Sequence, residues 1–247
     1  MASKYLLELE ISDFLLNMIP VMLLEFLAAM AGIFYIKKVE GALNEKILVL
    51  FLWYTFFNEV ISSYAGFAYF FNYEIFSFVK DTPFRNNYWL GNIQLLLGNV
   101  VYVYFFASML EKIRAKKILW LLTAIMVVSV LIDFTYNDFF GAFSKVSTIF
   151  GSLLILSSIL LFYMDLLASE KLLSLKYNLP FYVSVVLLIH TLCTSPLDFL
   201  SNYFKTSTGN DLFVSFRVYT LFFLNILLYL TYTIAFIRCS RKKHLSY

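Results

Sequence analysis

The sequence predicts an all-α membrane protein, a bundle of seven transmembrane helices. Composition is the first reason: of 247 residues, 61% are hydrophobic and only 14% are charged, which is typical of membrane proteins. The second is the presence of seven apolar runs, each reaching the length of about 20 residues that a helix needs to cross a bilayer. The third is that these runs are continuous, whereas the strands of a membrane β-barrel alternate between apolar and polar residues.

The seven expected spans follow one another with short connections. They lie near residues 14–36, 47–71, 88–110, 117–137, 145–168, 179–204 and 212–237. The longest connection, 72–87, is too short to bury a core of its own outside the bilayer. We therefore expect residues 1–247 to form a single transmembrane domain.

The first three spans are apolar runs with polar residues at their centres. Glu25 lies at the centre of the first span, Glu59 follows Asn58 at the centre of the second, and Asn99 lies at the centre of the third. Ionisable groups at membrane depth are rare and are candidates for function by default.

Of the last four spans, two carry charges only near their ends and two contain ionisable residues at membrane depth. The fourth and fifth carry charges only near their ends, where these can reach the interface. The sixth contains His190 near mid-depth and Asp198 in its outer half. The seventh contains Asn225 at its centre and Arg217 in its outer half.

The distribution of Lys and Arg predicts the orientation. Thirteen of the nineteen lie in the connections after the first, third and fifth spans and in the C-terminal tail, five lie on the opposite side, and Arg217 is inside the last span. By the positive-inside rule, the C-terminus is cytoplasmic and the N-terminus is outside. The net charge of +3 therefore reflects topology next to an anionic inner leaflet and does not indicate nucleic-acid binding.

The basic tail RCSRKKH at 238–244 is explained as a topology anchor. A specific lipid or protein site there stays an alternative. Since the sequence offers no Asn-x-Ser/Thr glycosylation acceptor and no disulfide framework, we expect a multi-pass protein of a bacterial inner membrane, with an organelle membrane as the alternative.

Helical spacing places the polar residues of several spans on single faces. Residues three, four or seven positions apart share a face of a helix. Four such faces occur: Thr55, Glu59, Ser62 and Gly66; Gly91, Asn92, Gly98 and Asn99; His190, Thr194 and Asp198; and Arg217, Leu221 and Asn225. We expect them to turn toward other helices, although close packing explains small residues and interhelical hydrogen bonds explain Asn and Gln without any ligand.

The two central carboxylates are harder to explain by packing. An acid at the centre of a membrane helix costs about 2.5–3.5 kcal/mol on the insertion scale, so Glu25 and Glu59 together cost about 5–7 kcal/mol. Burial could keep either acid protonated, or a cation such as Arg217 or His190 could pair with it. The alternatives are a purely structural role and a site for a proton, a cation or an amine-bearing ligand.

The sequence indicates neither an enzyme nor a cofactor or metal protein. The seventh span contains no Lys, which excludes a retinal Schiff base there. The two histidines, His190 and His244, are far apart in depth, and no HExxH motif or Cys cluster occurs. The chain also lacks a phosphate-binding glycine loop and a nucleophile elbow.

The turn into the third span reads RNNYWLGNIQ and contains Asn86, Asn87, Trp89 and Asn92. Together with the preceding span that holds Glu59, residues 45–125 resemble uncharacterised bacterial seven-transmembrane-helix proteins whose genes often lie near sensor kinase or response-regulator genes. The resemblance implies a seven-helix fold and a sensory or signalling association. It carries over no binding residue.

We therefore expect a receptor or sensory-accessory protein with a polar pocket in its outer half, binding a small ligand, cation or proton. The candidate ligand-binding residues are Glu25, Asn58, Glu59, Asn92, Asn99, His190, Asp198 and Arg217. Besides the lipid bilayer, the expected partner is a membrane or cytoplasmic signalling protein that contacts the basic loops and tail. The alternatives are a transporter or channel that uses Glu25 and Glu59 as a relay, and a structural subunit of a membrane complex.

Overall fold

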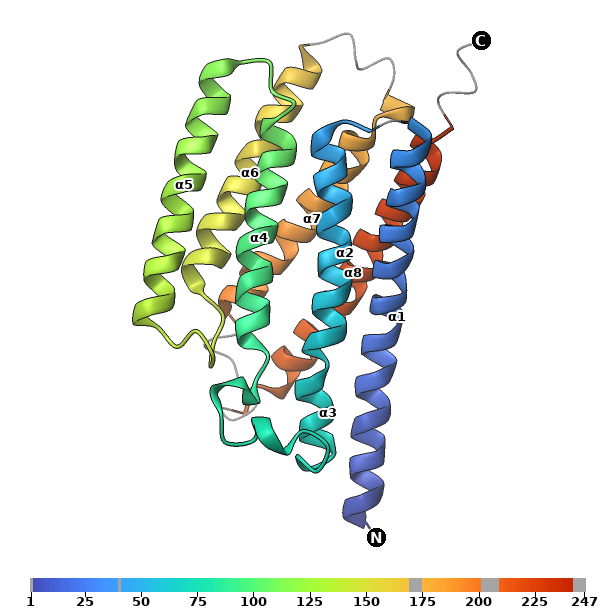
Figure 1. Cartoon of the computed structure of the whole chain (residues 1–247), viewed down its shortest axis with the longest axis vertical. Helices are drawn as coiled ribbons and strands as arrows, with labels where there is room; N and C mark the ends of the chain where they lie inside the picture. The colour runs from blue at the N-terminus through green and yellow to red at the C-terminus, as the bar shows by residue number, and fades with distance from the viewer. Residues whose placement is uncertain (1, 40, 169–174, 201–208, 242–247) are drawn as a thin grey trace.

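The structure, a computed structural model, describes residues 2–39, 41–168, 175–200 and 209–241, without the side chains of 2–10 and 13. All regular secondary structure in these residues is helical (Figure 1). The helices are α1 (Ala2–Val39), α2 (Leu43–Ser62), α3 (Tyr64–Phe70), α4 (Tyr88–Ala107), α5 (Ile113–Tyr136), α6 (Lys145–Leu167), α7 (Leu179–Leu200) and α8 (Asp211–Cys239), with short 3-10 turns η1 (Ser77–Val79) and η2 (Pro83–Arg85) between α3 and α4.

The predicted seven spans are confirmed. Within the described residues, seven helical segments are long and apolar enough to cross a membrane. They are Phe14–Val39, Leu43–Phe70, Tyr88–Ala107, Ile113–Tyr136, Lys145–Leu167, Leu179–Leu200 and Asp211–Cys239, so the boundaries differ from the expected ones by a few residues. Residues 201–204, assigned to the end of the sixth span, lie outside the described residues. The chain is thus a multi-pass membrane protein in contact with the lipid bilayer.

The second span is interrupted near its end. Helix α2 stops at Ser62 and α3 starts at Tyr64, while the Ser63 hydroxyl donates a hydrogen bond to the Val60 carbonyl at 2.7 Å. The chain leaves the bundle after α3 through Asn72 and Tyr73, which both have positive φ angles. This turn directs residues 74–87 across the end of the bundle on which the N-terminus lies (Figure 1).

Six of the spans form a closed ring. The order of neighbours around it is α1, α2, α4, α6, α7 and α8, and α8 packs against α1 to complete it. Helix α5 lies outside the ring against α4 and α6. Only 22% of its most apolar window is buried, against 33–44% for the other spans, because lipid covers most of its surface.

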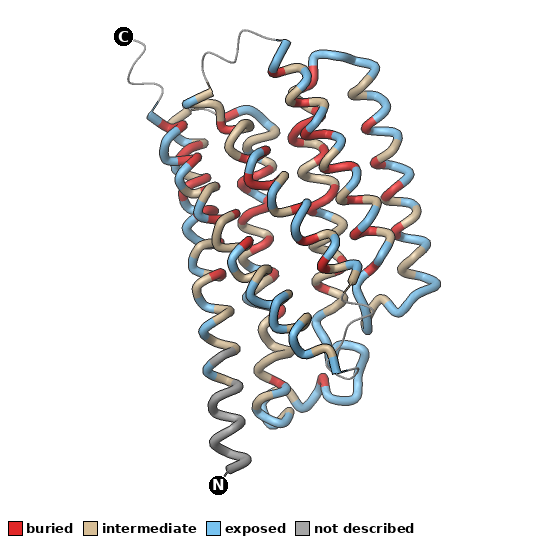
Figure 2. Tube along the Cα trace, turned by 180° about the vertical axis from the view of Figure 1, so that it is seen from behind, coloured by how far each residue is buried: buried red, intermediate tan, exposed pale blue. Residues whose placement is uncertain are grey.

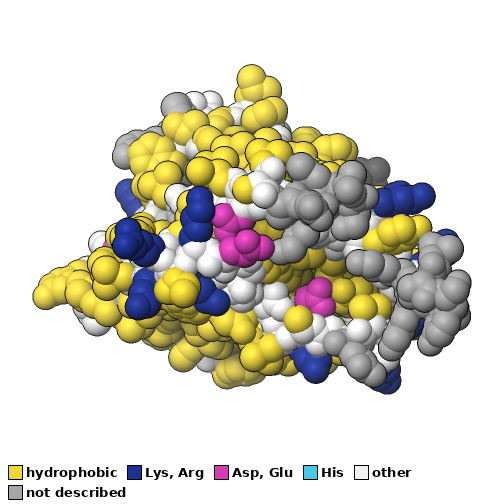
Figure 3. All heavy atoms as spheres, turned by 90° about the horizontal axis from the view of Figure 1, so that it is seen from above, with side chains coloured by type: hydrophobic (Ala, Val, Ile, Leu, Met, Phe, Trp, Pro, Cys, Tyr) yellow, Lys and Arg dark blue, Asp and Glu magenta, His cyan; other side chains and the backbone are white. Residues whose placement is uncertain are grey.

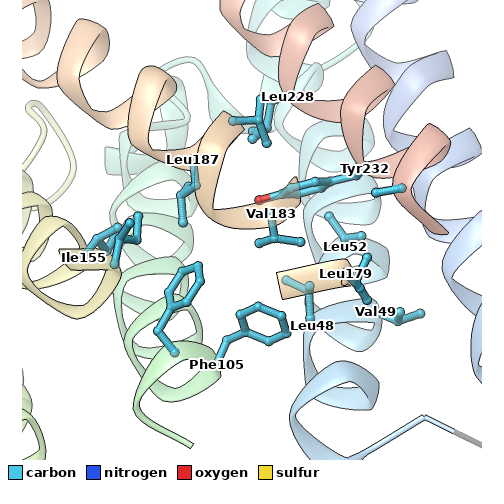
Figure 4. Packing of buried hydrophobic residues seen from close by; sticks show 14 of the residues in the cluster. Leu48, Val49, Leu52, Phe105, Ile155, Leu179, Val183, Leu187, Leu228 and Tyr232 are labelled. Carbon is cyan, nitrogen blue, oxygen red and sulfur yellow. The ribbon is translucent and has the colours of Figure 1, made fainter. Parts of the chain in front are cut away.

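The half of the bundle nearer the C-terminus has a dry core. Buried residues concentrate there in Figure 2, and Figure 4 shows side chains from five ring helices meeting in its centre. This apolar plug consists of Leu48, Leu52, Phe105, Ile155, Leu179, Val183, Leu187, Leu228 and Tyr232, all no more than 5% exposed. It closes the bundle on the side of the C-terminus.

The basic residues used to predict orientation lie at this same end. Ten of the thirteen are described, in the first or last turns of α1, α2, α5 and α8 or in the connections there: Lys37, Lys38, Lys46, Lys112, Arg114, Lys116, Lys117, Lys176, Arg238 and Arg241. Figure 3 shows basic side chains around the rim of this end face, with acidic ones nearer its centre. Lys171, Lys242 and Lys243 lie outside the described residues, as does most of the tail.

From the apolar plug we predict which side chains cannot be shortened without loss of stability. Phe105 is 0% exposed, so Phe105→Ala removes van der Waals contacts and leaves a cavity, which costs about 3–5 kcal/mol of unfolding free energy. Unfolding of the purified protein in detergent, followed by circular dichroism, measures this loss. The matched control is Leu121→Ala on α5, whose side chain is 62% exposed to lipid and should change stability little. Equal losses in the two variants would contradict the described core.

Candidate functional site

The half of the bundle nearer the N-terminus contains a cavity of about 620 Å³, here called the polar pocket. Its wall combines residues of α2, α4, α6, α7 and α8 with the 141–143 connection. Four of its side chains carry formal charges: Glu59, Lys145, Asp198 and Arg217. The pocket size falls in the range of about 300–1,000 Å³ that is usual for small-molecule sites.

Glu59 reaches the pocket because of its face on α2. Thr55 and Ser62, which share that face, are 2% and 7% exposed, as the helical spacing predicts. The Glu59 carboxylate lines the polar pocket, and among the described residues it has no hydrogen bond or ion pair. An acid in this position, within a membrane span, lacks the partner that its charge requires.

The opposite wall holds an ion pair between α7 and α8. Arg217 Nη2 donates to Asp198 Oδ1 at 2.8 Å, and the two side chains are 26% and 36% exposed. Arg217 Nε is buried and has no partner among the described atoms. Since a guanidinium carries five N–H donors, Arg217 can bind an anionic group while keeping Asp198.

A second cavity of about 240 Å³, the deep pocket, continues from the polar pocket toward the apolar plug. Asp198 and Asn225 line both cavities. In the deep pocket, His190 Nε2 and Asn225 Oδ1 lie 3.2 Å apart, which links α7 to α8. Ile155, Leu187 and Leu228 of the plug form its floor.

Glu25 is buried apart from Glu59. It is 3% exposed, lines neither the polar pocket nor the deep pocket, and its Oε2 has no hydrogen-bond partner among the described residues. The Tyr229 hydroxyl lies beside the carboxyl and interacts with it, while Tyr229 also lines the deep pocket. Tyr229 therefore stands between Glu25 and the deep pocket.

Asn92 holds the connection between α5 and α6. Asn92, 0% exposed, donates to the carbonyls of Phe139 and Ala142 and accepts from Ser144 N–H, each at 2.9 Å. It secures the connection before α6 and lies outside the polar and deep pockets.

Asn99 and Asn58 combine packing with a place in the cavities. Asn99 donates to the Ser147 carbonyl at 2.9 Å, where α4 meets α6 at Gly151; a Cβ on that glycine would lie 1.9 Å from Asn99 Nδ2. Asn58 Nδ2 donates to Gln94 Oε1, which joins α2 to α4.

The structure thus brings six of the eight predicted residues to two connected cavities. Asn58, Glu59, Asp198 and Arg217 line the polar pocket, and Asn99, His190 and Asp198 line the deep pocket. Glu25 lies behind Tyr229, and Asn92 holds a loop. The described residues include no group of three His, Cys, Asp or Glu side chains that could hold a metal ion.

Sequence reasoning did not include Asn225, Tyr229 and Lys145 among the candidate residues, although each lines a cavity. It grouped Asn225 with Arg217 on one face of the seventh span, and Tyr229 extends that face by four more positions. Lys145 starts α6 and also lines the polar pocket; its place at a span end suggested only an interfacial residue.

Comparisons of the chain with protein-family models, with curated proteins and with solved structures found no match. The resemblance of residues 45–125 to bacterial seven-helix proteins stays a prediction.

The hydrogen bonds of Asn92 predict that its role is structural. Asn92→Ala leaves the buried Ser144 N–H and two partly buried carbonyls without their partner, which should lower stability by about 1–3 kcal/mol. Asn92→Asp keeps the acceptor for Ser144 but loses both donors, so it should not restore full stability. Thermal unfolding in detergent compares the two variants with the unchanged protein. A wild-type midpoint for Asn92→Ala would refute this role.

Proposed function

We propose that this membrane protein is a receptor or sensory-accessory protein whose polar pocket binds a small molecule with a positively charged amine. The observation that supports this most is the Glu59 carboxylate, which lines a cavity of about 620 Å³ without a hydrogen bond or ion pair to any described residue. A bound ammonium group would neutralise the charge of the Glu59 carboxylate and donate up to three hydrogen bonds to it and its neighbours.

The surroundings of Glu59 suit such a ligand. Asn58 and Ser62 belong to the same helix and line the same cavity, so they offer oxygen acceptors near the carboxylate. The Arg217–Asp198 pair on the opposite wall supplies fixed charge that would orient a ligand with a second polar group. Charge-assisted hydrogen bonds of this kind are the stronger ones in proteins.

The shape of the bundle favours entry of a ligand into the N-terminal half alone. The polar pocket lies toward the N-terminal end, and the apolar plug closes the other end. Five ring helices contribute to the pocket wall, so a ligand that draws them together would change their packing at the far end as well. A signal would then reach a partner through the basic loops and the C-terminal tail.

We place the C-terminus in the cytoplasm and the protein in a bacterial inner membrane. The basic end face supports this orientation by the positive-inside rule. The resemblance of residues 45–125 to proteins encoded near sensor kinases supports the sensory assignment. The pocket would then face the exterior, where a receptor meets its ligand.

Glu59→Gln tests the proposal, because it keeps the shape of the side chain and removes its charge. Ligand binding stabilises a folded protein, so phosphoethanolamine, ethanolamine or putrescine should raise the melting temperature of the unchanged protein in detergent. Loss of one charge-assisted hydrogen bond, about 1.5–3 kcal/mol, should weaken binding about tenfold or more in Glu59→Gln.

The matched control is Glu74→Gln, which makes the same chemical change on an exposed residue outside the polar and deep pockets. It should bind like the unchanged protein. If no amine in the panel stabilises the protein in a manner that depends on Glu59, the pocket does not have this function, and a structural subunit becomes the better interpretation.

A transporter is a second candidate, and the position of Glu25 favours it. Glu25 has an unpaired buried oxygen next to Tyr229, which borders the deep pocket, so the two acids and this tyrosine form a possible proton route toward the plug. In that case, proteoliposomes with a trapped pH-sensitive dye should show proton movement on addition of ethanolamine. Glu25→Gln should abolish the movement and Glu74→Gln should not. Amine binding without any proton movement would exclude this candidate.

A further inference from the structure

A third cavity, of about 350 Å³, lies between α1, α2 with α3, and α8. We call it the lateral cavity. It shares Glu59, Ser62, Asn87 and Asn225 with the polar pocket, so the two cavities meet at the unpartnered carboxylate. The remaining wall is mainly apolar, formed by Phe14, Met18, Val21, Gly66, Val218 and Phe222 together with the polar Asn17 and Ser63.

The lateral cavity lies on the lipid side of the ring. Val218, in its wall, is 41% exposed, and its neighbour Tyr219 on α8 is 67% exposed. On α1, Leu16 and Ile19 are 68% and 45% exposed. Since lipid covers the exposed apolar surface of a membrane span, an acyl chain can reach this cavity without leaving the bilayer.

Toward the N-terminal end, aromatic contacts close the lateral cavity. The ring of Phe14 lies against Gly66, where a Cβ would be 2.5 Å from Phe14 Cζ. The same ring packs edge-on against Phe67 at 5.9 Å and tilted against Phe70 at 5.3 Å. Phe14 therefore forms the wall of the lateral cavity where α1 packs on α3.

A ligand that fills both cavities must be amphiphilic. Its positive group would lie at Glu59, at the junction of the two cavities, and an anionic group would suit Arg217, whose buried Nε has no partner, and Lys145, which also lines the polar pocket. Its apolar part would pass beside Val218 and Met18 into the lipid. An ammonium and a phosphate on one headgroup, attached to acyl chains, meet these demands.

We propose that the ligand of the polar pocket is a zwitterionic phospholipid with a primary ammonium headgroup, of the phosphatidylethanolamine type, which reaches the pocket through the lateral cavity between α1 and α8. This rests on the proposed function, because it names the molecule that Glu59 binds. A primary ammonium fits better than a quaternary one, since only N–H groups donate hydrogen bonds to a carboxylate.

Native mass spectrometry of the full chain in detergent, with added phosphatidylethanolamine or phosphatidylcholine, tests the proposal. The unchanged protein should retain phosphatidylethanolamine and much less phosphatidylcholine, which has the same phosphate but no N–H donor. Val218→Trp should obstruct the lateral cavity and strongly reduce the retention. Its control, Val128→Trp on the lipid-exposed face of α5 (56% exposed), should retain the lipid.

Soluble phosphoethanolamine separates the two proposals. It carries the headgroup without the chains, so it should stabilise the unchanged protein and Val218→Trp equally, and Glu59→Gln should lose both this effect and the lipid. Lipid retention that Val218→Trp leaves intact, or equal retention of the two lipids, would overturn the lipid proposal while the amine site stands. If phosphoethanolamine has no effect on either protein, the amine site itself is wrong.

Discussion

The arrangement of this protein depends on the high cost of exposing a charged group to hydrocarbon. Glu25, Glu59, Asp198 and Arg217 all lie within membrane spans, and each must face protein, another polar group or water. The closed ring of α1, α2, α4, α6, α7 and α8 meets this demand, because every helix of the ring has an inner face. Helix α5 lies outside the ring, and because it carries no charge at its centre, this position exposes no central charge to lipid.

Inside the ring, apolar and polar residues are divided along the membrane normal. The apolar plug holds the helices together in one half by van der Waals packing, the main attraction between helices in lipid. Because those contacts position the helices, the other half can tolerate cavities and an acid without a partner. Cavities and unpaired charges normally destabilise a fold, so their concentration at one end is consistent with a binding site there.

The contacts of helix α1 determine how the polar pocket is connected to the lipid phase. It closes the ring by packing along α8, which buries Glu25 next to Tyr229. Toward its N-terminal end it covers α2 and α3 mainly through Phe14, and the lateral cavity lies between these two contacts. The lateral cavity and the polar pocket meet at Glu59. A lipid can therefore enter from the bilayer and still place a charged headgroup at this carboxylate.

The sequence by itself determined the class, the number of spans and the faces that turn inward. Length, apolarity and a helical period of 3.6 residues are local properties, and a bilayer makes them decisive because only closed hydrogen-bonded structures can cross it. The same period correctly grouped Glu59 with Ser62, and Arg217 with Asn225, before their neighbours were known.

Only the tertiary structure decided which faces meet. Spacing along one helix cannot show that α4 packs beside α6 rather than α7, and so it could not show that Asn58 lines the polar pocket while Asn92 holds the connection before α6. Nor could it separate two glutamates at equal depth, of which one lies behind a tyrosine and the other faces the pocket. Both outcomes follow from the rotation and order of helices, which depend on contacts between residues far apart in the chain.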